Sequence, residues 1–131
     1  MFDLEPVVVS NVDKRKEFWT ELCGIIGFEL QHDFTNYLTF GKWAHSPSFA
    51  IAQASEQNFP RRVYLLSLAG TEEVKAFYRK AITIGAKEVE VPDAVGHVFM
   101  AKFLDLDGNT MQLYCKMNEV DKAHDIFEEL E

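Results

Sequence analysis

Apolar positions follow two different spacings along the first half of the chain, and each change of spacing marks an expected element. Residues 4–10 are apolar and rich in Val, which is typical of a buried strand. Apolar side chains then recur at helical spacing from Asn11, a plausible N-cap, to Gly27, a plausible left-handed C-cap. Alternating or apolar runs predict three more strands, at 28–33, 37–43 and 48–54.

The second half of the chain repeats this order. An apolar run at 62–69 predicts a strand, and Gly70 ends it. A helix with acids in its first turn begins at Thr71 and ends at Gly85. The remaining strands are expected at 86–91, 97–106 and 109–116, with a loop at 92–96 and a turn at Asp107-Gly108.

The similarity of the two halves predicts an internal duplication. Phe77-Tyr78 follows Phe18-Trp19 by 59 positions (77 − 18), and Leu68 follows Val9 by the same interval. Each half has the order βαβββ, whose sheet carries a helix on one face and exposes the other, so that two units combine around a concave cleft. We therefore predict one α+β domain over 1–131, with modules at 1–56 and 62–117 and a C-terminal helix at 118–131. A ferredoxin-like domain with accidental internal similarity is the alternative.

Composition and charge narrow the class of partner. The chain has 47% hydrophobic residues, and 21 acidic against 13 basic residues give a formal net charge of −8. This balance disfavours nucleic acid and anionic membrane surfaces, and it suits a neutral or cationic small molecule or a protein. We also expect a cytoplasmic protein with reduced Cys23 and Cys115, because no secretory signal or membrane-length apolar run is present.

Three segments together carry a family resemblance. They are the opening 9–13 with Phe18-Trp19 and the Gly27-Phe28 step, the second helix up to Gly85-Ala86, and the hairpin at 103–113. In this order they resemble the vicinal oxygen chelate superfamily, which includes glyoxalase I, extradiol dioxygenases, and fosfomycin- and bleomycin-resistance proteins. The hairpin departs from the family pattern in having Leu106 for the usual Pro and Gln112 for the usual Glu.

The resemblance implies a glyoxalase/bleomycin-resistance-like fold and, in many members, a metal held by residues of each module's first and last strands. The matching positions here are Leu4, Ala50 (or Ala52), Val63 and Gln112. Only Gln112 offers an oxygen ligand, whereas a catalytic metal centre needs several donors. We therefore expect neither a metal nor another cofactor, and a role outside standard metal-dependent glyoxalase or dioxygenase chemistry. A metal-dependent lyase, isomerase or dioxygenase with non-standard ligands, such as Glu5 and Gln53, is the alternative.

Strand alternation then selects the residues expected to face the cleft. Alternate residues share one face of a strand, so Thr110 and Tyr114 accompany Gln112. The resulting hypothesis is a homodimer that binds a small, cationic or aromatic molecule in a metal-free cleft. The residues assigned to it are Tyr37, Trp43, Ser67, His97, Met100, Lys102, Gln112 and Tyr114. Metal-free acid–base catalysis by Lys102, Tyr114 or His97, and binding of another protein, remain open.

Overall fold

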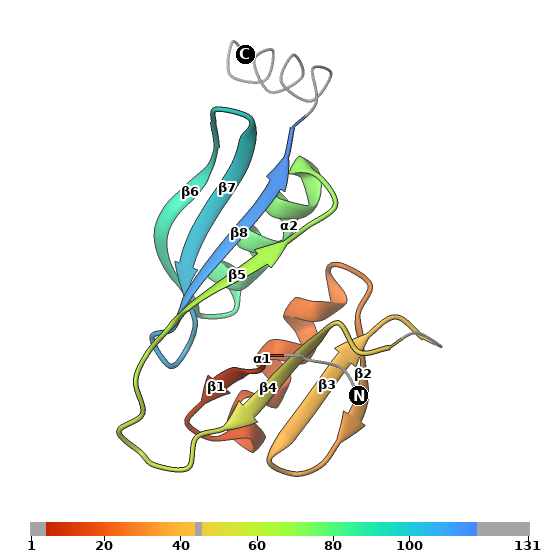
Figure 1. Cartoon of the computed structure of the whole chain (residues 1–131), viewed down its shortest axis with the longest axis vertical. Coiled ribbons are helices and arrows are strands. Elements are labelled where there is room, and N and C mark those ends of the chain that lie inside the picture. Colours follow the sequence, from red (N-terminus) through yellow and green to blue (C-terminus); the bar gives the residue numbers. More distant parts are fainter. Residues whose placement is uncertain (1–4, 44–45, 118–131) are drawn as a thin grey trace. The chain divides into compact units, whose positions relative to one another are not determined.

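The computed structural model describes residues 5–43 and 46–117, and its contacts divide the chain after Arg62 into two compact units. Unit 1 contains a four-stranded sheet with the strand order β1-β4-β3-β2 and one helix (Figure 1). β1 is parallel to β4, and the other pairs are antiparallel. Its elements are β1 (Val7–Val9), α1 (Val12–Gly24), β2 (Glu29–Asp33), β3 (Tyr37–Gly41) and β4 (Phe49–Gln53).

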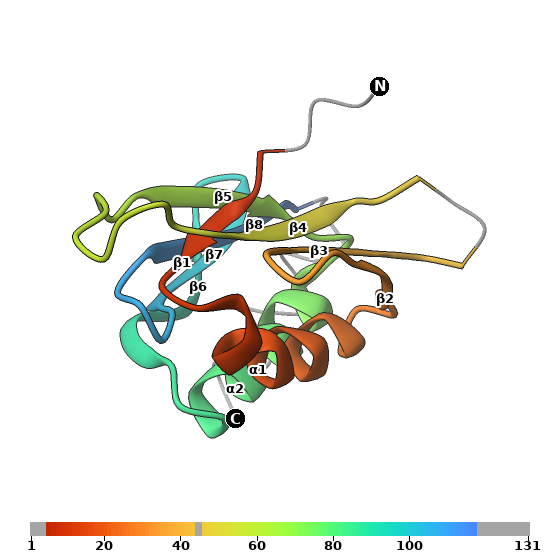
Figure 2. The same cartoon turned by 90° about the horizontal axis from the view of Figure 1, so that it is seen from below.

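Helix α1 covers one face of the unit 1 sheet, as Figure 2 shows. Trp19 is buried against Phe49 of β4, with ring centroids 5.2 Å apart, and Phe40 lies beside Phe49 at 6.1 Å. Leu22 is fully buried on the same helical face. The apolar face expected from the sequence is therefore the face that forms the core of unit 1.

Both ends of α1 are fixed by local hydrogen bonds. The Asn11 side chain accepts from the Lys14 backbone N–H at 3.0 Å, as expected of an N-cap. At the other end the Phe28 N–H donates to the Cys23 carbonyl, and Gly27 has a φ of 78°. This is a Schellman motif, so the helix ends at Gly24 and the residues before Gly27 form its closing turn.

Unit 2 repeats the arrangement of unit 1 with the strand order β5-β8-β7-β6. Its parallel pair is β5 and β8, and its remaining pairs are antiparallel. Its elements are β5 (Val63–Ser67), α2 (Thr71–Thr83), β6 (Lys87–Val95), β7 (Val98–Leu104) and β8 (Thr110–Lys116). The duplication expected from the sequence is thus present in the topology, and the α+β class is confirmed.

The core of unit 2 lies between α2 and the sheet. Phe77 and Tyr78 lie 6.3 and 6.4 Å from the ring of Phe103 on β7, and Met111 and Leu113 of β8 are fully buried. Helix α2 ends as α1 does, because the Ala86 N–H donates to the Ala81 carbonyl across a glycine of positive φ.

One expected boundary is wrong. The sequence predicts a loop at 92–96 because the segment contains Pro92 and Gly96, but β6 continues to Val95. β6 is an edge strand, where a proline need not donate to a neighbour, and its pairing with β7 shifts between Glu90 and Asp93.

The helix predicted at 118–131 lies outside the described residues. Within those residues, no helix is long and apolar enough to cross a membrane.

Candidate ligand-binding face

The face of the unit 2 sheet opposite α2 carries most of the residues selected from the sequence. Burial alternates along β7 and β8, so that Phe99, Ala101 and Phe103 are buried while Met100 and Lys102 are half-buried. We call this face, away from the helix, the open face. It is formed by Val63, Leu65, Ser67, Val98, Met100, Lys102, Thr110, Gln112 and Tyr114.

The strand register aligns the open-face residues in rows. Gln112 of β8 lies between Leu65 of β5 and Lys102 of β7. The next row places Tyr114 between Ser67 and Met100. Cross-strand neighbours on one face lie within about 5.5 Å at Cβ, so each row is a contiguous strip of mixed polar and apolar side chains.

Lys102 has a carboxylate partner on the edge strand. Its ammonium lies 3.5 Å from the Glu90 carboxylate, and Glu90 is opposite Lys102 in the β6–β7 register. A lysine between apolar neighbours needs such a partner or contact with solvent. Because Glu90 neutralises Lys102, an anionic ligand would have to compete with Glu90 for this lysine.

Lys102 and Tyr114 are not a facing pair. Lys102 is opposite Gln112 and Tyr114 is opposite Met100, so the two ionisable groups are diagonal neighbours. His97 lies in the turn between β6 and β7, where its carbonyl accepts from the Met117 N–H at 2.9 Å. It therefore stands at the end of the strip rather than within it.

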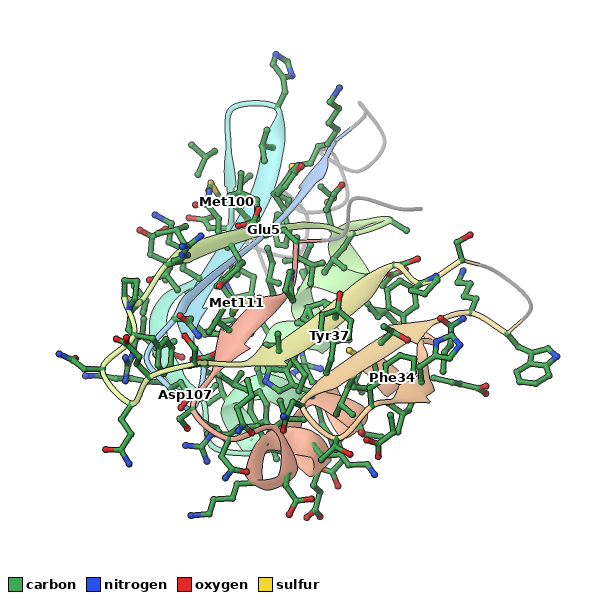
Figure 3. The ribbon with its side chains drawn as sticks, turned by 60° about the horizontal axis from the view of Figure 1, so that its bottom comes forward. Glu5, Phe34, Tyr37, Met100, Asp107 and Met111 are labelled. Carbon is green, nitrogen blue, oxygen red and sulfur yellow. The ribbon has the colours of Figure 1, made fainter. Side chains whose placement is uncertain are left out.

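The two aromatic residues selected from unit 1 have different surroundings. Tyr37 begins β3, is half-buried and pairs with Ala52 of β4, and Figure 3 labels it on this strand. Trp43 follows the end of β3 and its side chain is 83% exposed, so no packing fixes it in a binding surface. Phe49 of β4 is buried in the core against Trp19.

The described positions that the resemblance assigns to metal ligands carry no ligand cluster. Val63 is 62% exposed on β5, and Ala50 and Ala52 lie on β4. Leu4 lies outside the described residues. Over 5–43 and 46–117, no three His, Cys, Asp or Glu residues are grouped as metal ligands would be.

The two non-standard ligands considered from the sequence have other partners. The Gln53 side-chain oxygen accepts from the Val12 N–H at 3.1 Å and thereby caps α1. The Glu5 carboxylate lies 3.7 Å from the Arg62 guanidinium, and both side chains are largely exposed. A metal at either residue would have to share its oxygens with these contacts.

Glu90 is the functional candidate that the sequence analysis missed. The irregular register of β6 hides its facing, because the pairing with β7 shifts on both sides of Glu90. Only its opposite charge to Lys102 gave a signal, and a charge pair between strands is not recognisable before the strands are aligned.

Comparison with solved structures identifies the fold. The chain is similar to a glyoxalase/bleomycin resistance protein from Albidiferax ferrireducens T118, with a TM-score of 0.74 and 20% identity over 88% of this chain and 98% of that one. A putative glyoxalase from Bacillus halodurans gives a TM-score of 0.66 at 14% identity, over 88% of this chain and 95% of that one. A glyoxalase/bleomycin resistance protein/dioxygenase family enzyme from Burkholderia phytofirmans PsJN gives a TM-score of 0.65 at 13% identity, over 87% of this chain and 97% of that one.

The sequence comparisons add no relative. No protein-family model matches the chain, and no curated protein matches it. The structural similarity extends over almost the whole of each neighbour, so the fold of this chain is vicinal oxygen chelate-like. At these identities the likeness concerns the fold, and the function has to be argued from the residues of this chain.

Proposed function

We propose that this protein binds a small organic molecule, cationic or aromatic, on the open face of unit 2 without using a metal. The observation that carries the proposal is the strip formed by Leu65, Gln112 and Lys102. Leu65 is 66% exposed beside a half-buried amide, which combines an apolar contact with hydrogen-bonding groups that orient a ligand.

Charge favours a cationic or neutral ligand over an anionic one. The only lysine of the strip is already paired with Glu90, and the chain carries a net charge of −8. Tyr114 adds an aromatic ring with a polar tip in the neighbouring row. A flat cation can contact Leu65 and Tyr114 while its polar groups meet Gln112.

The metal-free part of the proposal rests on the chemistry of the residues. Aliphatic side chains at Val63, Ala50 and Ala52 have no lone pair to donate, and a single neutral amide at Gln112 is a weak site for a divalent ion. Metal-dependent chemistry with Glu5 and Gln53 is the competing function. The contacts of these two residues with Arg62 and with the α1 N-terminus weigh against it.

Metal analysis and ligand binding together test the proposed function. Protein purified without chelator is expected to contain far less than one equivalent of zinc, nickel, manganese or iron. Metal-free bleomycin, a cationic aromatic probe suggested by the names of the structural neighbours, is expected to raise the melting temperature, and to raise it further as its concentration increases.

Two matched variants locate the binding. Gln112→Ala is expected to weaken binding by about tenfold, the loss of one hydrogen bond to a charged ligand, whereas Gln57→Ala in an exposed loop leaves it unchanged. Stoichiometric metal would overturn the metal-free interpretation. Unchanged affinity in both Gln112→Ala and Leu65→Ala would exclude the open face as the binding site.

A further inference from the structure

The helix side of unit 2 holds a pocket that the proposed function does not use. It lies between α2 and the edge strand β6 and has a volume of about 440 Å³, within the range of small-ligand sites. Residues on one face of α2 form one side of the pocket, and fewer residues of β6 form the other side. The lining residues are Lys75, Tyr78, Arg79, Ile82, Thr83, Glu88 and Pro92.

Tyr78 brings an unused polar group to this pocket. The residue is only 6% exposed, and its hydroxyl has no partner in good hydrogen-bond geometry among the described residues, although the Glu88 carboxylate lies nearby. A buried hydroxyl without a partner costs free energy, and an acceptor placed beside it would recover that cost. Burial, followed by the nearby Glu88 carboxylate, raises the pKa of Tyr78, so the hydroxyl keeps its proton and acts as a donor.

The charged residues of the pocket favour a negative ligand. Lys75 and Arg79 contribute two cations, one helical turn apart, against the single carboxylate of Glu88. Lys75 is partly engaged, because its ammonium lies 3.6 Å from Glu72 and 5.6 Å from the Phe99 ring centroid. Arg79 is exposed and no ion pair joins it to the described part of the chain, so its planar guanidinium is available for a carboxylate.

The remaining lining residues suit a flat apolar body. Ile82 and Pro92 are half-buried and line the pocket from the helix and from the strand. The Thr83 hydroxyl donates to the Arg79 carbonyl at 2.8 Å and is therefore already satisfied. Donors thus come from Arg79 and Tyr78, and the apolar contact from Ile82 and Pro92.

We propose that the pocket between α2 and β6 binds a small aromatic carboxylate, with Arg79 and the Tyr78 hydroxyl holding its oxygens. The site belongs to unit 2 alone and lies on the helix side of the sheet, so it is separate from the open face. It would therefore operate whether or not the open face binds a ligand.

NMR titration of the full ¹⁵N-labelled chain with benzoate tests the proposal. Saturable shifts are expected for amides of α2 and β6, with a Kd below about 10 mM, a modest affinity for so small a ligand. Benzylamine, of the same shape and opposite charge, is expected to shift these α2 and β6 amides with at least about tenfold weaker affinity. Absence of saturation, benzoate shifts confined to β5 and β8, or equal affinity of benzylamine measured at the α2 and β6 amides would each overturn the proposal.

Variants separate the site from non-specific binding. Tyr78→Phe and Arg79→Gln are each expected to weaken benzoate binding by about tenfold, and Glu88→Gln to tighten it by removing the like charge. Lys87→Gln, an exposed cation on β6 outside the pocket, is the control and is expected to change nothing. Tyr78→Phe removes a hydroxyl that has no partner in good hydrogen-bond geometry, so the melting temperature is expected to be retained. Arg79→Gln tests the site at an exposed residue. Unchanged affinity in both variants would contradict the assignment.

Discussion

Asp105 organises the hairpin between β7 and β8 through three hydrogen bonds. Its Oδ1 accepts from the Asp107 N–H at 2.9 Å and the Asn109 N–H at 2.8 Å, and its Oδ2 accepts from the Asn109 side-chain amide at 3.0 Å. Both Asp105 and Asn109 are buried. The sequence located this turn through Asp107-Gly108, but the residue that holds it together precedes that pair.

Replacement of Asp105 by Ala is expected to destabilise the protein by about 2–4 kcal/mol, because it leaves buried donors of Asn109 without an acceptor. Urea unfolding followed by circular dichroism measures the change. Asp105→Asn keeps one acceptor oxygen and is expected to lose less. Equal stability of Asp105→Ala and the unmodified chain would show that the hairpin does not depend on this carboxylate.

At the scale of the element, the two helices are ended by the same device in both units. Gly27 and Gly85 have φ values of 78° and 117°, where an L side chain is strained. Gly24, at the end of α1, has no positive φ, and the space that a methyl group would occupy there is open. A side chain is therefore disfavoured at Gly27 and accommodated at Gly24.

Gly27→Ala is expected to lower the free energy of unfolding by about 1 kcal/mol, and Gly24→Ala to raise it by about 0.5 kcal/mol through the lower entropy of the unfolded chain. Thermal unfolding of the two variants, three residues apart, compares them directly. A loss at Gly24 as large as that at Gly27 would argue against a specific need for the left-handed conformation.

At the scale of the whole molecule, β5 is the feature that favours association. It is an edge strand of the unit 2 sheet, and Val63 and Leu65 on it are exposed. Proteins seldom leave an apolar edge uncovered in solution. The homodimer expected from the sequence is therefore retained as a proposal.

Light scattering is expected to give a mass about twice 15.0 kDa at micromolar concentration. Leu65→Lys places a charge on the apolar edge strand and is expected to shift the protein towards the monomer. Gln57→Lys, in an exposed loop, is the control and is expected to leave the mass unchanged. A monomer mass for the unmodified chain would contradict the proposal.

The sequence by itself determined the repeated order of elements and the facing of β7 and β8. The helical stripes, the glycines at the helix ends and the alternation on β7 and β8 are local signals, because each depends on neighbours along one element. The aromatic pairs at 18–19 and 77–78 indicated the duplication because each pair belongs to the local pattern of its own helix.

Only the tertiary structure decided which side chains meet. The pairing of Lys102 with Glu90 required the irregular register of β6, and the pocket around Tyr78 required the packing of α2 against that strand. Both depend on contacts between different elements, and the spacing of residues along the chain does not encode which residues of different elements are neighbours. The loop predicted at Pro92 is wrong because the effect of a proline on a strand depends on whether that strand lies at a sheet edge.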